Sequence, residues 1–177
     1  MTIMAIMSCK VKYLKNYNLK EWGILKSAIN TDSCVDLRAA IPKPIMLYSI
    51  QDFVEYKIQS VVYPHSAHDI PYYIITIPSG ISIELPMDYD VTVRSRSGLS
   101  SKYGIQVINA PGTIDNGYRG EIGIPLINLG MDSFTINPGD RLAQMKLQKV
   151  HNVEYMTVEK LNNSERSIGG FGHTGIR

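Results

Sequence analysis

Turn-forming residues interrupt the sequence at short intervals from Val35 onward, and this spacing limits the folds open to the chain. Pro, Gly or Asn-Gly recurs roughly every 8 to 15 residues, and Val, Ile and Tyr dominate between them. β-branched and aromatic residues favour strands, whereas Gly, Pro and Asn favour turns. No helical stretch separates these segments, which argues against a parallel sheet with helical crossovers. The pattern is typical of an all-β sandwich or barrel.

Strands are predicted in the segments between these turns. The segments are Ile45–Tyr48, Tyr56–Tyr63, Tyr72–Ile77, Ile81–Glu84, Asp90–Ser95, Gly104–Ile108, Gly120–Asn128, Phe134–Ile136, Arg141–Val150 and Val153–Val158. Near the start, Cys9–Leu14 alternates like a short strand. The only helical segment predicted lies in residues 1–30, where Leu14, Leu19, Trp22 and Leu25 are spaced by polar residues.

Length and charge narrow the class of protein. The 177 residues fit one domain spanning residues 1–177. The net charge of +2 gives no argument for nucleic acid or a membrane surface. No apolar run is long enough to span a bilayer, and the opening MTIMAIM lacks the features of a signal peptide. We therefore expect a cytoplasmic protein that binds neither nucleic acid nor membrane.

Cysteine and histidine do not form a metal-binding pattern. Cys9 and Cys34 are widely separated, and packing is the ordinary role of such free thiols. His65 and His68 are close enough to be a metal pair, but two ligands do not complete a zinc site.

Val93–Gly120 has the densest chemistry in the chain. Arg94 and Arg96 would share one face of a strand, and Ser97-Gly98 would form a turn beside them. A guanidinium next to hydroxyl and backbone N–H donors suits a phosphate, although a solvated edge strand has the same composition.

Thr113–Tyr118 is predicted to form a β-hairpin, because Asn-Gly tolerates positive φ. Asp115 would lie at its base, either capping the turn or taking a proton from water. Asn109 would either read a base through its amide or satisfy turn backbone. Tyr118 would form a flat pocket wall.

Two later segments offer polar groups of their own. Gln144 is an amide on a mostly apolar strand, and Arg141 is expected to pair with a carboxylate. Asp36 lies in an apolar stretch, so it needs hydrogen-bond partners if buried. The tail, residues 162–177, is Gly-rich and either disordered or a mobile flap that offers the ring of Phe171.

Five segments, in order, resemble the motifs of the trimeric deoxyuridine triphosphatases, the dUTPase family. The segments are CVDLRAA (34–40), RSGLSSKYGI (96–105), NAPGTIDNGYRGEIGI (109–124), NPGDRLAQM (137–145) and RSIGGFGHTG (166–175). The resemblance implies a distorted jelly roll (β-clip barrel) of short, mostly antiparallel strands with a flexible Gly-rich C-terminal arm. It also implies a homotrimer with shared active sites that hydrolyses dUTP to dUMP and pyrophosphate. This reaction keeps uracil out of DNA and supplies dUMP for dTMP synthesis.

The resemblance assigns roles to matching residues. Asp115 would be the catalytic base that directs water at the α-phosphorus. Mg²⁺ would be held mainly by the substrate phosphates, with Asp36 as an outer-shell contact through water. The substrate-binding residues implied are Arg96, Ser97, Gly98, Asn109, Gly112, Thr113, Ile114, Tyr118, Gly123, Gln144, Arg166, Phe171, Gly172, His173 and Thr174.

The chain departs from the family pattern at three places. Ser167 replaces the glycine that usually follows the arginine of the fifth motif, and Gly117 stands where an acid is common. The interval between Asp36 and Arg96 is longer than in compact members, which places an insertion at about residues 48–73. We expect the insertion to be an added hairpin, with a protein partner as one role for it.

Other functions share some of these features. A dCTP deaminase has the same fold and would release ammonia. A dUTPase-fold protein with an added regulatory role would keep the motifs. A structural jelly-roll protein, such as a coat component, would not need Arg96, Asp115, Gln144 and Phe171 together.

Overall fold

The computed structural model describes residues 8–27, 29, 32–55, 73–164 and 167. Short strands dominate it, and the strands pair antiparallel throughout the described residues. Their bounds are β1 Lys10–Tyr13, β2 Val35–Arg38, β3 Ile45–Leu47, β4 Ile74–Pro78, β5 Ile81–Glu84, β6 Tyr89–Ser95, β7 Ile105–Val107, β8 Gly112–Ile114, β9 Gly123–Asn128, β10 Phe134–Ile136 and β11 Arg141–Lys149. The antiparallel, β-rich architecture confirms the predicted class.

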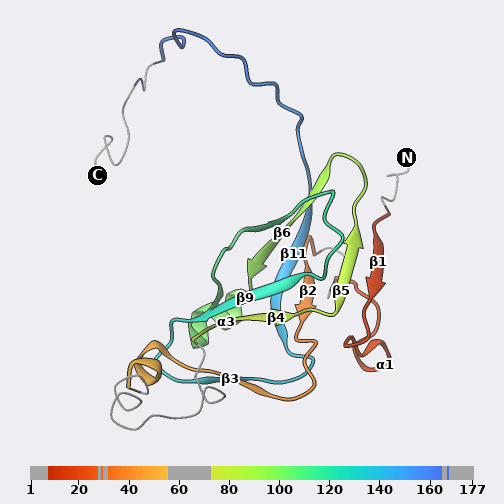
Figure 1. Ribbon diagram of the computed structural model, residues 1–177, viewed down its shortest axis with the longest axis vertical. Helices are drawn as coiled ribbons and strands as arrows, with labels where there is room; N and C mark the ends of the chain where they lie inside the picture. The colour runs from red at the N-terminus through yellow and green to blue at the C-terminus, as the bar shows by residue number, and fades with distance from the viewer. Residues whose placement is uncertain (1–7, 28, 30–31, 56–72, 165–166, 168–177) are drawn as a thin grey trace.

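A four-stranded sheet in the order β2-β11-β6-β8 forms the centre of the molecule (Figure 1). Gln144 on β11 lies opposite Asp36 on one side and Arg94 on the other. Thr92 lies opposite Lys146 and Thr113 in the same way. Since alternate residues of a strand point to one face, these polar residues share a face of the sheet.

The opposite face of this sheet contributes to the hydrophobic core. Val91 and Val93 of β6 and Leu37 of β2 are buried there. The three-stranded sheet β4-β9-β7 supplies further core residues, because Ile124 and Leu126 alternate inward along β9. Pairs β1-β5 and β3-β10 complete the described sheets. The sheets therefore enclose one apolar cluster, which leaves the polar face of the central sheet available for chemistry.

Helices account for two corrections. The predicted N-terminal helix is only α1, Leu19–Trp22. Another helix, α3 at Ser97–Tyr103, occupies the place where a Ser-Gly turn was predicted. Serine and glycine are poor helix formers, so local propensity did not favour it. Two features compensate for this low helix propensity. Leu99 packs against the core, and Gly104 ends the helix in the left-handed conformation.

Most predicted strands are present within a few residues, but one is absent and another lies outside the described residues. Residues 153–158 form no strand, and every residue from 151 to 164 is exposed. A strand needs a neighbour for its backbone groups, and nothing in the described part of this chain pairs with them. Tyr56–Tyr63 lies outside the described residues. β2 was not predicted as a strand, and β8 was predicted only in part, as one arm of the hairpin at Thr113–Tyr118.

The predicted hairpin at Thr113–Tyr118 is also a correction. β8 pairs with β6, whereas β9 pairs with β4 and β7, so the two strands enter different sheets. Residues 115–122, called the crossover loop below, therefore connect two sheets. Asn116-Gly117 still forms a turn, so the turn signal was correct and the pairing inferred from it was wrong.

The insertion begins with a helical turn at residues 50–55 rather than a strand, which corrects the expected hairpin over its described part. Ser49 caps this turn by accepting a hydrogen bond from the Asp52 N–H at 3.0 Å. Hydrogen bonds from the Ser133 and Ser49 hydroxyls hold the pKa of Asp52 below its usual value. The rings of Phe53 and Tyr73 lie 4.5 Å apart, so the described ends of the insertion meet at one place.

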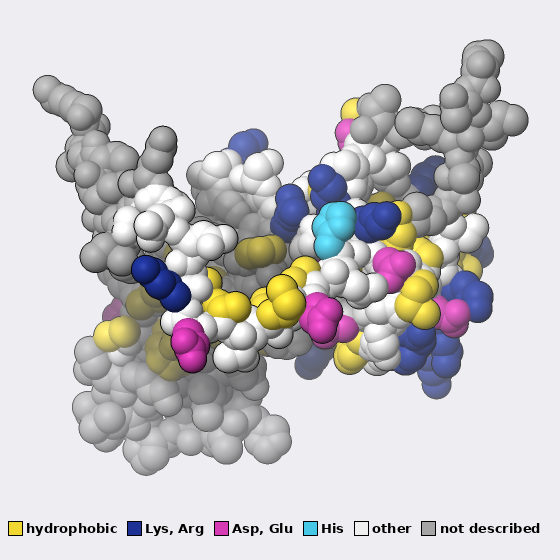
Figure 2. All heavy atoms as spheres, turned by 90° about the horizontal axis from the view of Figure 1, so that it is seen from above, with side chains coloured by type: hydrophobic (Ala, Val, Ile, Leu, Met, Phe, Trp, Pro, Cys, Tyr) yellow, Lys and Arg dark blue, Asp and Glu magenta, His cyan; other side chains and the backbone are white. Residues whose placement is uncertain are grey.

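Charges on the face drawn in Figure 2 are of both signs and interspersed, in keeping with the small net charge. Among the described residues, no helix is long and apolar enough to cross a membrane.

Two glycines with positive φ allow a test of the packing. Gly104 (φ 70°, ψ 10°) is in the left-handed helical conformation, whereas Gly23 (φ 68°, ψ −172°) is in an extended conformation that other residues rarely adopt. A Cβ on Gly104 would lie 2.7 Å from the Cα of Gly130, whereas a Cβ on Gly23 would meet nothing within 4 Å. Gly23→Ala should cost about 1–3 kcal/mol of unfolding free energy through backbone strain alone. Gly104→Ala should cost more, about 2–5 kcal/mol, because overlap with Gly130 adds to its left-handed strain. Urea unfolding measures both; equal losses would contradict the close approach of Gly104 and Gly130.

Candidate active site

The central sheet brings four of the five motif segments together. β2 carries the first, β6 leads into the second, β8 belongs to the third and β11 to the fourth. These segments are separated by up to about a hundred positions in sequence but lie on adjoining strands, whose spacing is about 4.8 Å. The residues singled out from sequence therefore share one structural frame.

Asp36 lies between two arginines from neighbouring elements. Its Oδ1 is 3.0 Å from Arg96 Nε, and its Oδ2 is 3.2 Å from Arg141 Nη1. The first contact is an ion pair without hydrogen-bond alignment, and the second is a hydrogen bond. Arg96 Nη1 also donates to the Arg141 carbonyl at 2.9 Å. The expected partner of Arg141 is thus Asp36, and the cluster keeps a net positive charge.

Gln144 lies next to this cluster, opposite Asp36 in the register. Asp36 and Gln144, with Asp32, Ser33 and Cys34, line a pocket of about 260 Å³. Ser97 and Gly98 follow Arg96 directly at the start of α3 and are exposed. The first N–H groups of a helix have no partner within it, so this end of the sheet offers donors and positive charge.

Sequence reasoning missed a contribution from the N-terminal segment. The indole of Trp22 covers Gly139, since a Cβ on that glycine would lie 3.0 Å from Trp22 Cε2. Arg38 Nη1 donates to the Gly139 carbonyl at 2.8 Å. Trp22, Arg38 and Arg141 border a cavity of about 140 Å³ beside the cluster. The signal available in sequence was Gly139 (φ 83°), a glycine that leaves room for a ring.

Asp115 is exposed in the crossover loop at the other edge of the sheet. Its carbonyl accepts a hydrogen bond from the Tyr118 N–H at 3.0 Å, which closes the turn. Asp115 lines a pocket of about 390 Å³ that includes Asp90 and Asn116. Its carboxylate makes no hydrogen bond with the described residues, so the turn-capping alternative gains no support.

Residues around the crossover loop pack tightly on glycines. Asn109 folds over Gly112, where a Cβ would lie 3.0 Å from Asn109 Nδ2. The ring of Tyr118 lies against Gly120, and its hydroxyl donates to the Glu121 carbonyl at 2.8 Å. The close packing of Asn109 on Gly112 and of Tyr118 on Gly120 explains why glycines occur at these places.

The remaining predicted binding residues differ in accessibility. Thr113 is exposed, and Ile114 is half-buried beside it. Gly123 begins β9, where a Cβ would lie 2.8 Å from Thr76 Cγ2, so packing alone accounts for this glycine. Arg166, Phe171, Gly172, His173 and Thr174 lie outside the described residues.

Asp115 and Arg96 stand at opposite ends of the sheet. Ile114 is opposite Val91 on β6, and Arg96 comes five residues after Val91 on that segment. At about 3.4 Å per residue the two ends are roughly 17 Å apart. The pocket at Asp115 includes neither Arg96 nor Gln144. Within one chain, the predicted base and the predicted phosphate-binding residues therefore lie apart; these two places are called the half-sites below.

At Asp36, a metal ion could be accommodated only through an intervening water. Within the described residues, no group of three or more His, Cys, Asp and Glu side chains is placed to hold an ion. Both Asp36 oxygens already face guanidinium groups, so direct ligation would break the cluster. A water-mediated contact to an ion carried by phosphates fits this arrangement.

Comparison with known proteins identifies the family. A sequence model described as dUTPase matches residues 58–175, more than half of the chain. The chain belongs to the dUTPase family. The deoxyuridine 5'-triphosphate nucleotidohydrolase of Finegoldia magna is 54% identical over 99 residues, which cover 56% of this chain and 69% of that protein. That of Chlamydia trachomatis serovar D is 53% identical over 100 residues, with 56% and 69% covered.

Solved structures share the fold. Staphylococcus bacteriophage 80alpha dUTPase with dUPNHPP superposes with a TM-score of 0.71 at 23% identity, covering 96% of this chain and 99% of that one. A dUTPase from phage phi11 of S. aureus, described with a species-specific insert, gives a TM-score of 0.64 at 21% identity, covering 89% and 99%. These likenesses confirm the predicted jelly-roll fold. The first motif lies before the matched range 58–175, yet the structure places it in the central sheet.

Removing the carboxylate of Asp36 tests the cluster. Its side chain is only 18% exposed, so Asp36→Asn would leave two guanidinium groups close together without a counter-charge. We expect a loss of about 1–3 kcal/mol in unfolding free energy by urea titration. Glu84→Gln is the matched control, because its pair with Lys10 is exposed at 45% and 78% and should change stability little. Equal effects of the two changes would contradict a stabilising role for Asp36.

Proposed function

We propose that this chain is a dUTP diphosphatase, which hydrolyses dUTP to dUMP and pyrophosphate. The observation that carries the proposal is the convergence of four family motifs on one sheet, with a cationic cluster at one end and an exposed aspartate at the other. Relatives that are 54% and 53% identical over 99 and 100 residues of this chain are named for that activity. The reaction removes dUTP as a source of uracil in DNA and provides dUMP for dTMP synthesis.

Asp115 acts as the base in this proposal. Its exposed carboxylate can accept a proton from a water held against the α-phosphorus, and attack in line with the leaving pyrophosphate follows. The α–β phosphoanhydride bond breaks, and the water oxygen remains on dUMP.

The positive cluster and the start of α3 hold the triphosphate. Arg96, Ser97, Gly98 and Gln144 supply a guanidinium, a hydroxyl, backbone N–H groups and an amide. Mg²⁺ is the proposed cofactor, and a mutant phi11 phage dUTPase has been described with a structural Mg(II) ion. The phosphates would hold the ion, with Asp36 in contact through water. When bound, Mg²⁺ neutralises phosphate charge.

The crossover loop and the residues next to it would bind the nucleoside part of the substrate. Asn109, with backbone at Gly112, Thr113 and Ile114, would read the uracil edge. Tyr118 would pack on the deoxyribose and exclude a ribose 2′-hydroxyl. The contact of its ring with Gly120 supports a fixed wall at that place. Gly123 remains a predicted substrate contact, although its close packing on Thr76 is enough to explain why a glycine occurs there.

Assembly from more than one chain follows from the separation of the half-sites. Successive phosphates are joined by one oxygen, so a base at the α-phosphate must lie within several ångströms of groups that hold the β-phosphate. The roughly 17 Å between the two ends of the strand is too long for this. A head-to-tail ring of copies would bring Asp115 of one chain to Arg96 of another. We propose the family's homotrimer.

The exposed segment 151–164 supports the same assembly. It leaves the end of β11 and runs away from the body (Figure 1), with Tyr155 92% exposed. Such a segment can carry Arg166 and Phe171 to a site on another copy, where Phe171 would stack on uracil and Gly172, His173 and Thr174 would cover the phosphates. We propose this 162–177 flap as a closing element.

Three further expectations stay proposals. Residues 1–177 would form a single domain that acts in the cytoplasm. The 48–73 insertion would offer a surface for a protein partner; a phage relative is described with a species-specific insert. A dCTP deaminase is the alternative enzyme, and no described contact favours it.

Replacement of the base gives a direct test. Asp115→Asn keeps the shape of the side chain but cannot accept the proton, so kcat for pyrophosphate release from dUTP should fall roughly 10²–10⁴-fold. The native chain should release little pyrophosphate from UTP, dTTP or dCTP and no ammonia from dCTP. Full activity of the variant would exclude Asp115 as base, and equal turnover of UTP would exclude the role of Tyr118.

Mixing two inactive variants tests the shared site. Asp115→Asn and Arg96→Met each disable a different half-site. Subunits exchanged at random should recover about a quarter of native activity, since each site needs one intact half from each of two chains. Sites contained within single chains would recover none. Each variant alone, unfolded and refolded in the same way, is the control.

A further inference from the structure

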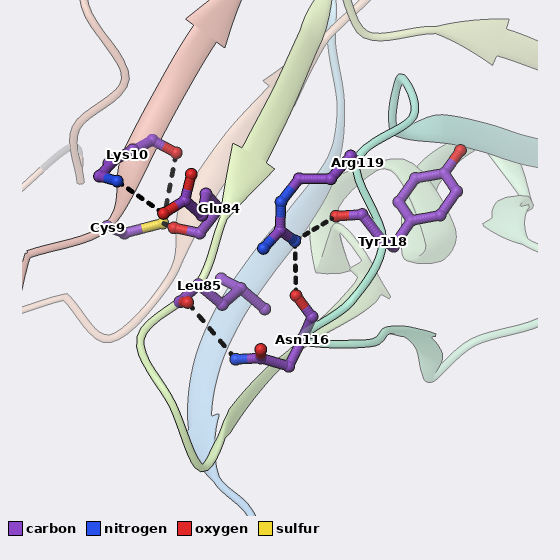
Figure 3. A network of polar contacts seen from close by, with 7 residues as sticks. All are labelled: Cys9, Lys10, Glu84, Leu85, Asn116, Tyr118 and Arg119. Carbon is purple, nitrogen blue, oxygen red and sulfur yellow. Dashed lines mark hydrogen bonds and ion pairs between the residues drawn. The ribbon is translucent and has the colours of Figure 1, made fainter.

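The turn that carries Asp115 is anchored by the amide of Asn116. Asn116 Nδ2 lies 2.7 Å from the Pro86 carbonyl, 3.3 Å from that of Tyr89 and 3.4 Å from that of Leu85. Figure 3 shows the side chain reaching from the crossover loop to the Leu85 carbonyl. Three acceptors around one nitrogen require the donor end of the amide to face them, since its oxygen would be repelled. Asn116 thus ties the turn to the loop between β5 and β6.

The same turn is held from its other side by Arg119. Arg119 Nη1 donates to the Asn116 carbonyl at 2.6 Å and to the Tyr118 carbonyl at 2.9 Å. Hydrogen bonds from a charged donor are stronger than those between neutral groups. In Figure 3 the guanidinium lies within the curve of the loop, and the Tyr118 ring points away from it. One cation therefore fixes the backbone on both sides of Gly117.

Arg119 is itself next to the supporting pair β1-β5. The hydrogen bond and charge of Lys10, followed by the charge of Arg119, hold the pKa of Glu84 below its usual value. Lys10, Glu84 and Arg119 line one surface groove of about 410 Å³. The guanidinium is thus placed between a carboxylate on β5 and the carbonyls of the crossover loop.

We infer that Asn116 and Arg119 form a clamp that positions Asp115 and Tyr118 for the reaction. The inference rests on the proposed function, because it assigns these residues to the base and the sugar wall. Neither residue is assigned to the substrate, so both are positioning residues. A base must lie within hydrogen-bond reach of its water, and a displacement of about 1 Å can cost a hundredfold in rate. Asn116 acts mainly on Asp115, and Arg119 acts on Tyr118 as well.

The closing experiment compares isosteric variants in steady-state assays on the whole protein. Asn116→Asp puts acceptors in place of donors among three carbonyls, and kcat for dUTP should fall about ten- to a hundredfold with KM within threefold. Asn116→Ser, which retains one donor, should recover part of this loss. Arg119→Met should lower kcat and also reduce the preference for dUTP over UTP severalfold, and Arg119→Lys should restore part of both.

Asn128→Asp is the matched control for a purely structural effect. Its amide makes the same kind of bonds, to the carbonyls of Leu47 at 3.1 Å and Asp132 at 2.9 Å, at the other end of β9 from the crossover loop. This variant should lose thermal stability but keep kcat per folded molecule. The Asn116 and Arg119 variants could instead behave like this control and lose thermal stability while kcat and the preference for dUTP over UTP stay unchanged. That result would contradict the proposed clamp.

Hydrogen exchange separates failure of the clamp from failure of the proposed function. Amides of residues 113–120 should exchange faster in Asn116→Asp and Arg119→Met than in the native chain, whether or not the chain turns over dUTP. A native protein that releases no pyrophosphate overturns the proposed function. Unchanged exchange in these variants overturns the clamp. Should Asn116→Asp fail to fold, Asn116→Ser and Arg119→Met provide the same comparison.

Discussion

The ion pairs of the Asp36 carboxylate with Arg96 and Arg141 hold together one end of the central sheet. Two guanidinium groups from different elements approach each other there, and without a counter-charge they would repel. Asp36 offsets one of the two charges, so the cluster stays cationic and can attract phosphates. Because Arg96 also bonds the backbone of Arg141, strands β2, β11 and β6 are linked by side chains in addition to their ladders. The proposed phosphate binding and the cohesion of the sheet thus use the same three residues.

Local composition predicted the strand-rich class and the approximate positions of most strands, since β-branched runs and turn residues act locally. Local composition failed where strand pairing or tertiary packing determines the structure of a segment. Asn116-Gly117 signals a turn, but it cannot say that β8 and β9 enter different sheets. α3 has weak helix propensity and exists through Leu99 and the Gly104 cap. Val153–Val158 has strand composition but no partner among the described residues of a single chain.

The sequence was enough to select candidate site residues but not to predict how they are arranged. Asp36, Arg96, Asp115 and Gln144 were all selected from sequence, and the pairing of Arg141 with a carboxylate is confirmed. The packing of Trp22 on Gly139 and the three carbonyls around Asn116 were not. Such contacts join segments more than a hundred positions apart, or a turn to a distant loop. A local sequence pattern therefore cannot predict them. The distance between the half-sites likewise follows from strand register alone.

The placement of Asp115 and Arg96 at opposite ends of the sheet has a genetic consequence. In the proposed ring, each chain would lend its base to one site and its phosphate-binding end to another. A chain defective in both ends would then spoil two sites of three while occupying one position. Two variants of the protein made in one cell would therefore not act independently: the damaged copy would be partly dominant, and chains with complementary damage would partly rescue each other.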